Sequence, residues 1–230
     1  MKKIFIIISC MWLLSCAAFG QQIKNKNAEL EDFFSLLGAA GYEIFSYDIS
    51  EMLKERYNIT FVKKEFSAGK EIESLDLTTV PNKRLLTEFP ESQWQKIIDE
   101  GRVIDQETQA IAHVEKIFFG FYPSGNDSTK LMHINVPGFT RMNGKITLKG
   151  LVQKDSDNLL FFYNTRPFKI SEFKENEFIP LVLLASGWFD EKFNIFRFCG
   201  EREIEPDMSS EILKEIPHHY VLGVKFTKKQ

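Results

Sequence analysis

The sequence has few of the residues that mark several protein classes. Only 13 Gly and 8 Pro occur among 230 residues, which excludes collagen-like and low-complexity chains. An excess of one charge is also missing, because 29 basic residues oppose 32 acidic ones and leave a formal charge of −3. That balance argues against nucleic acid as a partner. A chain of this length buries enough surface to fold without a disulfide or a metal.

Cysteine is scarce as well. The chain has three cysteines, and only Cys199 lies outside the first twenty residues. A single thiol cannot form an internal disulfide. Because Cys199 falls within the strand-like pattern of residues 196–200, we expect a small buried hydrophobic side chain there rather than a nucleophile.

Long apolar runs are absent after the N-terminal segment. The best candidate, Ile179–Phe189, is interrupted by Pro180, Ser186 and Gly187. It falls well short of the roughly 18 apolar residues that a transmembrane helix needs. We therefore expect contact with a membrane only through an N-terminal lipid.

The first residues have the pattern of a secretory signal. A basic start precedes eleven apolar residues, 4–14, a run too short to span a bilayer. Ala18-Phe19-Gly20 is a small-x-small cleavage site that would end the signal at residue 20. Leu13-Leu14-Ser15-Cys16 resembles a bacterial lipobox, which would remove residues 1–15 and lipidate Cys16. Both routes predict an extracytoplasmic protein, periplasmic or associated with the outer membrane.

Helical patterns are few and mostly N-terminal. Asn27 is a candidate cap for a helix whose apolar stripe comprises Leu30, Phe33, Phe34 and Leu37. The spacing of apolar residues predicts a second amphipathic helix over 48–57, which Asp48 would cap. Short helices are expected near 92–100 and 208–216.

Strand patterns dominate the rest. Alternation in 145–152 and the apolar run 159–163 predict a hairpin over 145–165, with 154–158 as its turn. Four other sets of strands are expected: 114–122 with 130–136, 181–189 with 192–199 turning at Asp190-Glu191, single strands near 58–66 and 70–79, and a closing strand over 220–226.

These elements predict an α+β fold built mostly from antiparallel hairpins, as a sheet or sandwich with helices at its ends or on one face. Consecutive strands lie at hairpin distances, without the helices of a parallel sheet between them. We expect one domain over 27–230, after a signal of 1–20 or 1–15. A composition shift near residue 102 marks a candidate subdomain boundary.

No catalytic, cofactor or metal motif is present. Of the four histidines, His218 and His219 are adjacent, so on a strand they point to opposite faces and cannot share a metal. Asp155 and Asp157 lack the glycine and distal glutamate of a calcium loop. The chain has no G-x-S-x-G and no glycine-rich phosphate loop. We predict no catalytic residue, no cofactor and no metal.

One aromatic position stands out as a candidate ligand contact. Trp188 follows Gly187, which has no side chain to crowd a ligand, and precedes a predicted turn. Tyr163 and Arg166 close the neighbouring hairpin strand, where they would supply a hydrogen bond and a stacking guanidinium. Core packing beside Phe189 is the competing interpretation.

The N-terminal signal followed by Gln21-Gln22, and the Phe-rich, Lys/Glu-rich body, resemble exported Bacteroidetes-type proteins of unknown function. Asp127-Ser128-Thr129 resembles the acceptor triplet for O-glycosylation of such proteins, which implies a sugar on Ser128. The resemblance is limited to the signal and the general style of the chain, and it implies no active site.

We therefore expect an exported envelope protein, most simply a non-enzymatic binding or assembly module. Two alternatives stay open: a secreted hydrolase acting on glycans, and a carrier of a hydrophobic small molecule. The expected partner is an envelope protein, a glycan or an apolar ligand. An apolar patch would indicate a partner-binding module, whereas a Phe-lined cavity of several hundred Å³ would indicate a carrier.

Overall fold

The computed structural model describes residues 27, 29–152, 159–170, 172–190 and 192–229. The predicted signal with Cys16, and the predicted turn 154–158, lie outside these residues. The chain divides into two compact units, Met1–Leu36 and Leu37–Gln230. Helix α2 (Leu30–Ala39) begins in the first unit, and its apolar side chains are exposed. None of the helices in the described part of the chain is long and apolar enough to cross a membrane.

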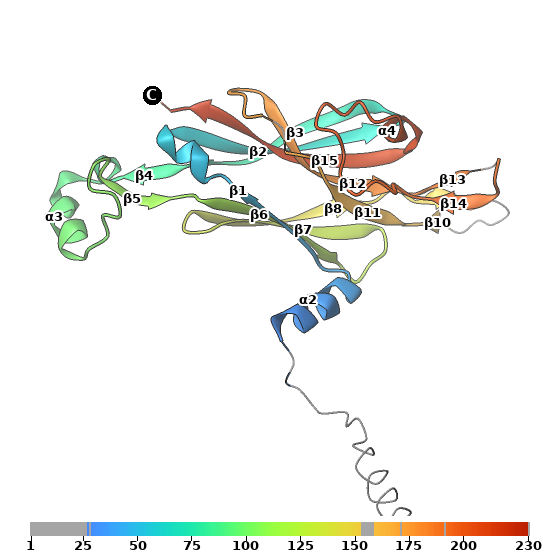
Figure 1. Ribbon diagram of the computed structural model, residues 1–230, viewed down its shortest axis with the longest axis horizontal. Helices are drawn as coiled ribbons and strands as arrows, with labels where there is room; N and C mark the ends of the chain where they lie inside the picture. The colour runs from blue at the N-terminus through green and yellow to red at the C-terminus, as the bar shows by residue number, and fades with distance from the viewer. Residues whose placement is uncertain (1–26, 28, 153–158, 171, 191, 230) are drawn as a thin grey trace, which may run out of the picture. The chain divides into compact units, whose positions relative to one another are not determined.

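Two antiparallel sheets form most of the second unit (Figure 1). The four-stranded sheet A has the order β1-β6-β7-β8 and the five-stranded sheet B has the order β11-β12-β15-β2-β3. The strands of sheet A are β1 (Glu43–Asp48), β6 (Lys116–Pro123), β7 (Thr129–Val136) and β8 (Thr140–Thr147). The strands of sheet B are β11 (Tyr163–Pro167), β12 (Phe178–Ser186), β15 (His218–Lys228), β2 (Tyr57–Ser67) and β3 (Lys70–Pro81). The expectation of a mostly antiparallel β protein is confirmed.

Smaller elements lie at the two ends of the sandwich (Figure 1). The elements at one end are β4 (Lys83–Leu85), η2 (Leu86–Glu88), α3 (Glu91–Asp99) and β5 (Ala110–His113). Two short hairpins are at the other end: β9 (Leu151–Val152) with β10 (Leu159–Leu160), and β13 (Trp188–Asp190) with β14 (Ile195–Arg197). The remaining helices are the 3-10 helix η1 (Ser50–Lys54) and α4 (Ile212–Glu215).

The main core lies between the two sheets. Strand side chains alternate between faces, so one face of each sheet is apolar. Sheet A contributes Ile117, Phe119 and Phe121, and sheet B contributes Ile59 and Phe61, all at most 1% exposed. Burying each such side chain stabilises the fold by about 1.5–3 kcal/mol.

The outer face of sheet B is covered too. A second apolar cluster joins Leu183 and Val221 of the sheet to Cys199, Ile204 and Ile216 of the chain that crosses it. Strands β12 and β15 are therefore buried on both faces, which explains their nearly continuous apolar sequence. Cys199 is buried as expected, and burial raises the pKa of its thiol.

Two of the predicted helices are wrong in extent. In place of a helix over 48–57 the structure has the last residue of β1, Asp48, the short 3-10 helix η1 and the first residue of β2, Tyr57. Asp48 ends β1 in pairing with Lys116, and Tyr57 begins β2 in pairing with Lys228, so long-range strand pairing at both ends limits the helical segment to η1. The helix expected near 208–216 is only the four residues of α4, whereas α3 occupies the region expected near 92–100.

Two of the predicted hairpins are also wrong in extent. Ile146 belongs to β8, which pairs with β7, and the strand ends before Gly150. A Cβ at Gly150 would lie 2.8 Å from the Leu159 side chain, so the chain packs tightly where the predicted strand would have continued. Residues 181–186 pair with β11 and β15, so the third hairpin consists of only β13 and β14. The hairpin of β6 and β7, strands β2 and β3, and the closing strand β15 agree with the expectation.

Candidate ligand-binding site

A cavity of about 440 Å³ opens between the two sheets at the β1 edge of sheet A. Its volume is within the range of sites that hold small organic ligands, about 300–1,000 Å³. The lining residues come from both sheets, from η1 and from the chain before β12. The apolar ones are Tyr47, Ile49, Met52, Ile117, Ile170, Phe173, Ile179, Leu181, Val224 and Phe226.

An aromatic cluster forms one wall. The rings of Phe173 and Phe226 meet edge to face with centroids 5.4 Å apart, and Tyr57 packs edge to face on both. The backbone N–H of Asn176 donates to the carbonyl of Phe226 at 2.8 Å, which ties the segment carrying Phe173 to strand β15. This wall is therefore held in place by hydrogen bonding as well as by ring packing.

Tyr47 crosses the space between the sheets. Its hydroxyl donates to the carbonyl oxygen of Leu181 at 2.6 Å, which connects β1 to β12. Burial raises the pKa of Tyr47, so the phenol stays neutral. With its proton engaged, this hydroxyl is unsuited to acid–base chemistry, and it adds apolar ring surface to the cavity.

The charged residues of the lining face water. Asp48, Glu51 and Glu172 are exposed there. Hydrogen bonds from Ser50 lower the pKa of Asp48. Ile170 also lies at the mouth and is 86% exposed, although it is apolar. The cavity thus has an apolar interior and a water-facing rim.

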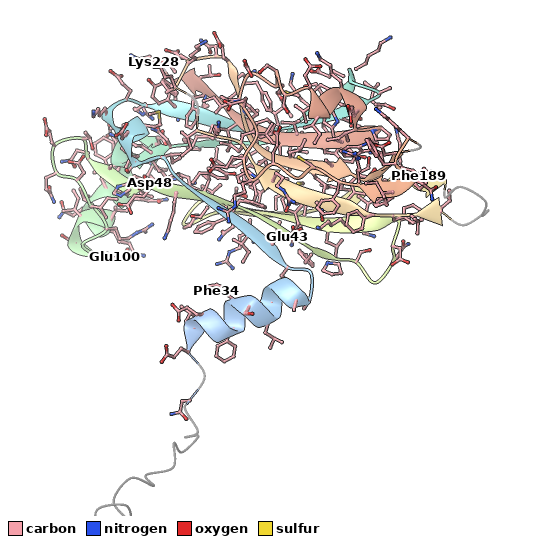
Figure 2. The ribbon with its side chains drawn as sticks, turned by 45° about the vertical axis from the view of Figure 1, so that its right-hand side comes forward. Phe34, Glu43, Asp48, Glu100, Phe189 and Lys228 are labelled. Carbon is pink, nitrogen blue, oxygen red and sulfur yellow. The ribbon has the colours of Figure 1, made fainter. Side chains whose placement is uncertain are left out.

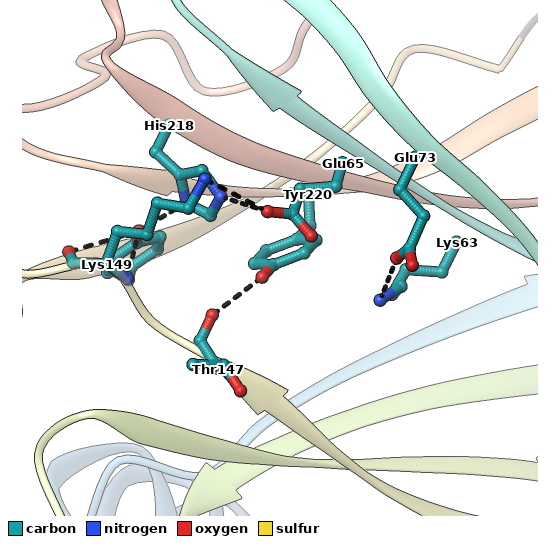
Figure 3. A network of polar contacts seen from close by, with 8 residues as sticks. Lys63, Glu65, Glu73, Thr147, Lys149, His218 and Tyr220 are labelled. Atoms are coloured by element: carbon teal, nitrogen blue, oxygen red, sulfur yellow. Dashed lines mark hydrogen bonds and ion pairs between the residues drawn. The ribbon is translucent and has the colours of Figure 1, made fainter.

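A buried polar network lies elsewhere in the sandwich (Figure 3). The Nε2 atom of His218 is 3.0 Å from Oε1 of Glu65, and its Nδ1 atom is 2.6 Å from the Tyr163 hydroxyl. Lys149 binds both ends, since its Nζ lies 3.3 Å from Oε1 of Glu65 and its backbone N–H donates to the Tyr163 oxygen at 3.0 Å. Beside them the Tyr220 hydroxyl donates to the carbonyl of Thr147 at 2.7 Å.

Titration keeps this network in one hydrogen-bonding pattern. Burial lowers the pKa of His218 despite the opposing effect of Glu65, so the ring is neutral near pH 7. Burial alone would raise the pKa of Glu65, but the hydrogen bonds from His218 and Lys149 outweigh it and lower that pKa. A neutral ring that donates from Nε2 to the Glu65 carboxylate accepts at Nδ1 from Tyr163. Burial, the largest influence, raises the pKa of Tyr163 to about 12.

Every ring nitrogen and carboxylate of this set is thus engaged within the protein. His218 is 1% exposed and keeps no nitrogen for a substrate. The network joins β2, β11 and β15 to the chain after β8, and it fits a structural clasp better than an acid–base pair.

The other histidines are separate from the clasp. His219 points to the opposite face of sheet B, where its ring stacks on Phe66 at 4.7 Å. Neither of its ring nitrogens has a hydrogen-bond partner among the described residues. Burial, with a smaller contribution from His218, lowers its pKa to about 4. In the described ranges no group of three His, Cys, Asp or Glu side chains could hold a metal.

The three ligand contacts expected from the sequence have different surroundings. Tyr163 belongs to the clasp. Arg166 points to the other face of sheet B and donates to the carbonyls of Cys199 and Glu201 at 3.0 and 2.8 Å. Trp188 is partly buried against the outer cluster and lines a separate pocket. Ser128 is partly exposed in the turn after β6, where its hydroxyl donates to Oδ1 of Asn126.

Sequence reasoning missed the cavity wall at Tyr47 and Phe173. The period-two signal of β1 is weak, because Phe45 and Tyr47 are two residues apart but Ile44, which points the other way, is apolar as well. Phe173 stands alone in a polar segment, and no periodic pattern marks it.

The fold and the cavity together define a two-layer antiparallel β protein with a ligand-sized apolar cavity. The chain belongs to the family described as a domain of unknown function, DUF5041, whose model matches residues 12–228. No curated protein and no solved structure matches the chain.

Proposed function

We propose that this protein is an exported, non-enzymatic binding module of the cell envelope, and that it holds an apolar ligand in the cavity between its sheets. The observation that carries the proposal is the cavity itself, an open hollow of about 440 Å³ lined by Phe173, Phe226 and aliphatic side chains of both sheets. An apolar molecule that enters it removes its own surface and that of the walls from water, which favours binding.

Two further features support this function over hydrolysis. The cavity has no histidine in its lining, and its carboxylates are at the mouth, exposed to water. The buried His218 is paired with the carboxylate of Glu65, and this pair is used within the clasp. A carrier needs only a shaped apolar interior, which these residues supply.

The location is proposed from the N-terminal sequence. The short apolar run after a basic start supports export, and the resemblance to exported Bacteroidetes-type proteins agrees with it. The intact mass of the protein from its native cell should show a chain that begins at Gln21 or at a lipid-bearing Cys16. A chain that retains Met1 would contradict export.

Binding is tested with a neutral fluorescent probe, N-phenyl-1-naphthylamine, which brightens in apolar surroundings. The wild-type protein should bind it saturably, and an alkyl alcohol should displace it. Met52 lines the cavity from η1, so Met52→Trp should fill the space and weaken binding by about tenfold or more.

Leu53→Trp is the matched control, because Leu53 lies on the same 3-10 helix, is also partly buried and is not part of the lining. It should leave the affinity unchanged. Equal losses in the two variants, or no saturable binding by the wild-type protein, would contradict the proposal.

A further inference from the structure

Within the unit Leu37–Gln230 no layer of chain covers the outer face of sheet A, in contrast to that of sheet B. Alternate residues of the four strands belong to this face, because their neighbours point into the core. Figure 2 labels Glu43 and Asp48 at the two ends of β1, the edge strand of the face. The segments that build the face, 42–48 and 116–147, are described without a gap.

Strand pairing determines which side chains are neighbours on this face. Phe118 lies opposite Asn135, and Asn135 lies opposite Arg141, so these residues form one row across β6, β7 and β8. The next row consists of Ile44, Gly120, His133 and Asn143. Residues that are directly opposite each other on paired strands share a face, so each row places its side chains side by side.

A shallow hollow of about 340 Å³ lies at the β7–β8 turn, beside the end of the first row. Its lining includes Asn135 and Arg141 and no acidic residue. Neither of these two side chains forms a hydrogen bond or an ion pair with any residue in the described ranges. The ring of Phe139 also lines the hollow, and the guanidinium carbon of Arg84 lies 5.4 Å from the centroid of that ring. The hollow therefore offers donors that the fold itself does not use.

The charge of this face is opposite to that of the whole chain, which has 32 acids against 29 bases. The charged residues at the described positions of the face are the bases Lys116, Arg141 and Lys145 and the acid Asp48. Glu115, which precedes β6, lies 2.9 Å from Nε2 of His113. An anion at the hollow would therefore meet an excess of positive charge.

Aromatic rings and neutral hydrogen-bonding groups lie on the same face. The rings of Tyr42 and Tyr122 are parallel, with centroids 5.7 Å apart, and Phe118 belongs to the same face of β6 as Tyr122. In the middle row, Nδ1 of His133 and Oδ1 of Asn143 are 2.7 Å apart, which leaves the amide N–H groups of Asn143 as donors. Rings bordered by such donors suit a sugar, which has an apolar C–H face and hydroxyl groups at its edge.

We propose that the outer face of sheet A binds an acidic glycan, with a sugar carboxylate at Arg141 and linked sugars along the row from Asn135 to Phe118. Adjacent strands are about 4.8 Å apart, close to the length of one sugar unit, so a row across several strands fits a short run of linked sugars. Peptides bind as an added strand at a sheet edge or as a helix in an apolar groove, and this face offers neither. The site goes beyond the proposed function and is separate from the apolar cavity, which lies on the inner side of sheet A.

The test is isothermal titration calorimetry of the full chain with a mannuronate tetrasaccharide. This ligand should bind saturably, and its affinity should fall as salt is added, because salt screens the exposed charges. The mannose tetrasaccharide with the same linkage lacks the carboxylates and should bind about tenfold more weakly or worse. A capped peptide of four glutamates has the same charge without sugar rings, and its affinity should be lower by about tenfold as well.

Two variants test the residues of the row, each with a matched control. Arg141→Gln should weaken binding of the acidic tetrasaccharide about fivefold or more, whereas Arg202→Gln, on the chain that crosses sheet B, should have no effect. Phe118→Ala should also weaken binding by about fivefold, whereas Phe193→Ala removes an exposed ring outside the face and should leave it unchanged.

Four results would overturn the proposal. Equal affinity for the acidic and the neutral tetrasaccharide would remove the role of the positive charge. Equal or tighter binding of the glutamate peptide would mean that the face takes an acidic protein instead. Equal effects of Arg141→Gln and Arg202→Gln would exclude the row as the site, and so would the absence of saturable binding by the mannuronate tetrasaccharide.

Discussion

Acidification should destabilise the fold through His219. This ring is 1% exposed, and burial lowers its pKa from 6.5 to about 4. As the pH falls below about 6.5, the unfolded state therefore takes up a proton that the folded state refuses. The stability that His219 provides is complete above that pH and is lost progressively down to about pH 4. One proton corresponds to about 1.4 kcal/mol per pH unit, so about 2.5 kcal/mol is lost by about pH 4.5.

The assay is urea unfolding at a series of pH values, for the wild-type protein and for His219→Phe. Phenylalanine fills a similar space on Phe66 without a titrating group. Extra volume in the core changes the level of stability by about 1–3 kcal/mol, but not its dependence on pH. The variant should therefore lose about 2.5 kcal/mol less than the wild-type protein on acidification.

His133→Phe is the control, since His133 is partly exposed on β7 and hydrogen-bonded to Asn143. It should keep the steep pH dependence of the wild-type protein. Parallel curves for the wild-type protein and His219→Phe would refute the reasoning, because the acid-sensitive group would then be another one.

Three other substitutions test the clasp and the packing beside it. Tyr163→Phe leaves Nδ1 of His218 without its donor, and should lower the free energy of urea unfolding by about 1–3 kcal/mol; no change would contradict the clasp. Leu148→Ala removes a buried side chain and should cost about 2–5 kcal/mol in the same assay. Lys149→Ala breaks a half-exposed ion pair and should cost less than about 1 kcal/mol; equal losses for these two variants would contradict the observed burial.

Much of the sheet content could be predicted because its signals are local. The alternation in β15 and the turn between β6 and β7 both lie within a few residues of each other. The failure at 48–57 has a non-local cause. Asp48 does accept a hydrogen bond from the backbone of Ser50, as a capping residue would, but Tyr57 begins β2 and pairs with Lys228. No local window contains that pairing.

The candidate sites were less accessible to sequence reasoning. Glu65, Tyr163 and His218 are separated by up to 153 residues, and only the order of strands in sheet B brings them together. Gly187 was expected to leave room for a ligand, whereas the Phe196 ring fills that space. Opposite faces for His218 and His219 were predicted correctly, because strand geometry alone determines them.

The claim that an apolar ligand enters the cavity between the sheets is tested most directly by methyl NMR. With Ile, Leu and Val methyl groups labelled, titration with the neutral naphthylamine probe should shift the signals of Ile117, Leu181 and Val224, which line the cavity. The signals of Leu151 and Leu160, in the pocket beside Trp188, should stay in place. Shifts confined to Leu151 and Leu160, or no shifts at all, would contradict the account.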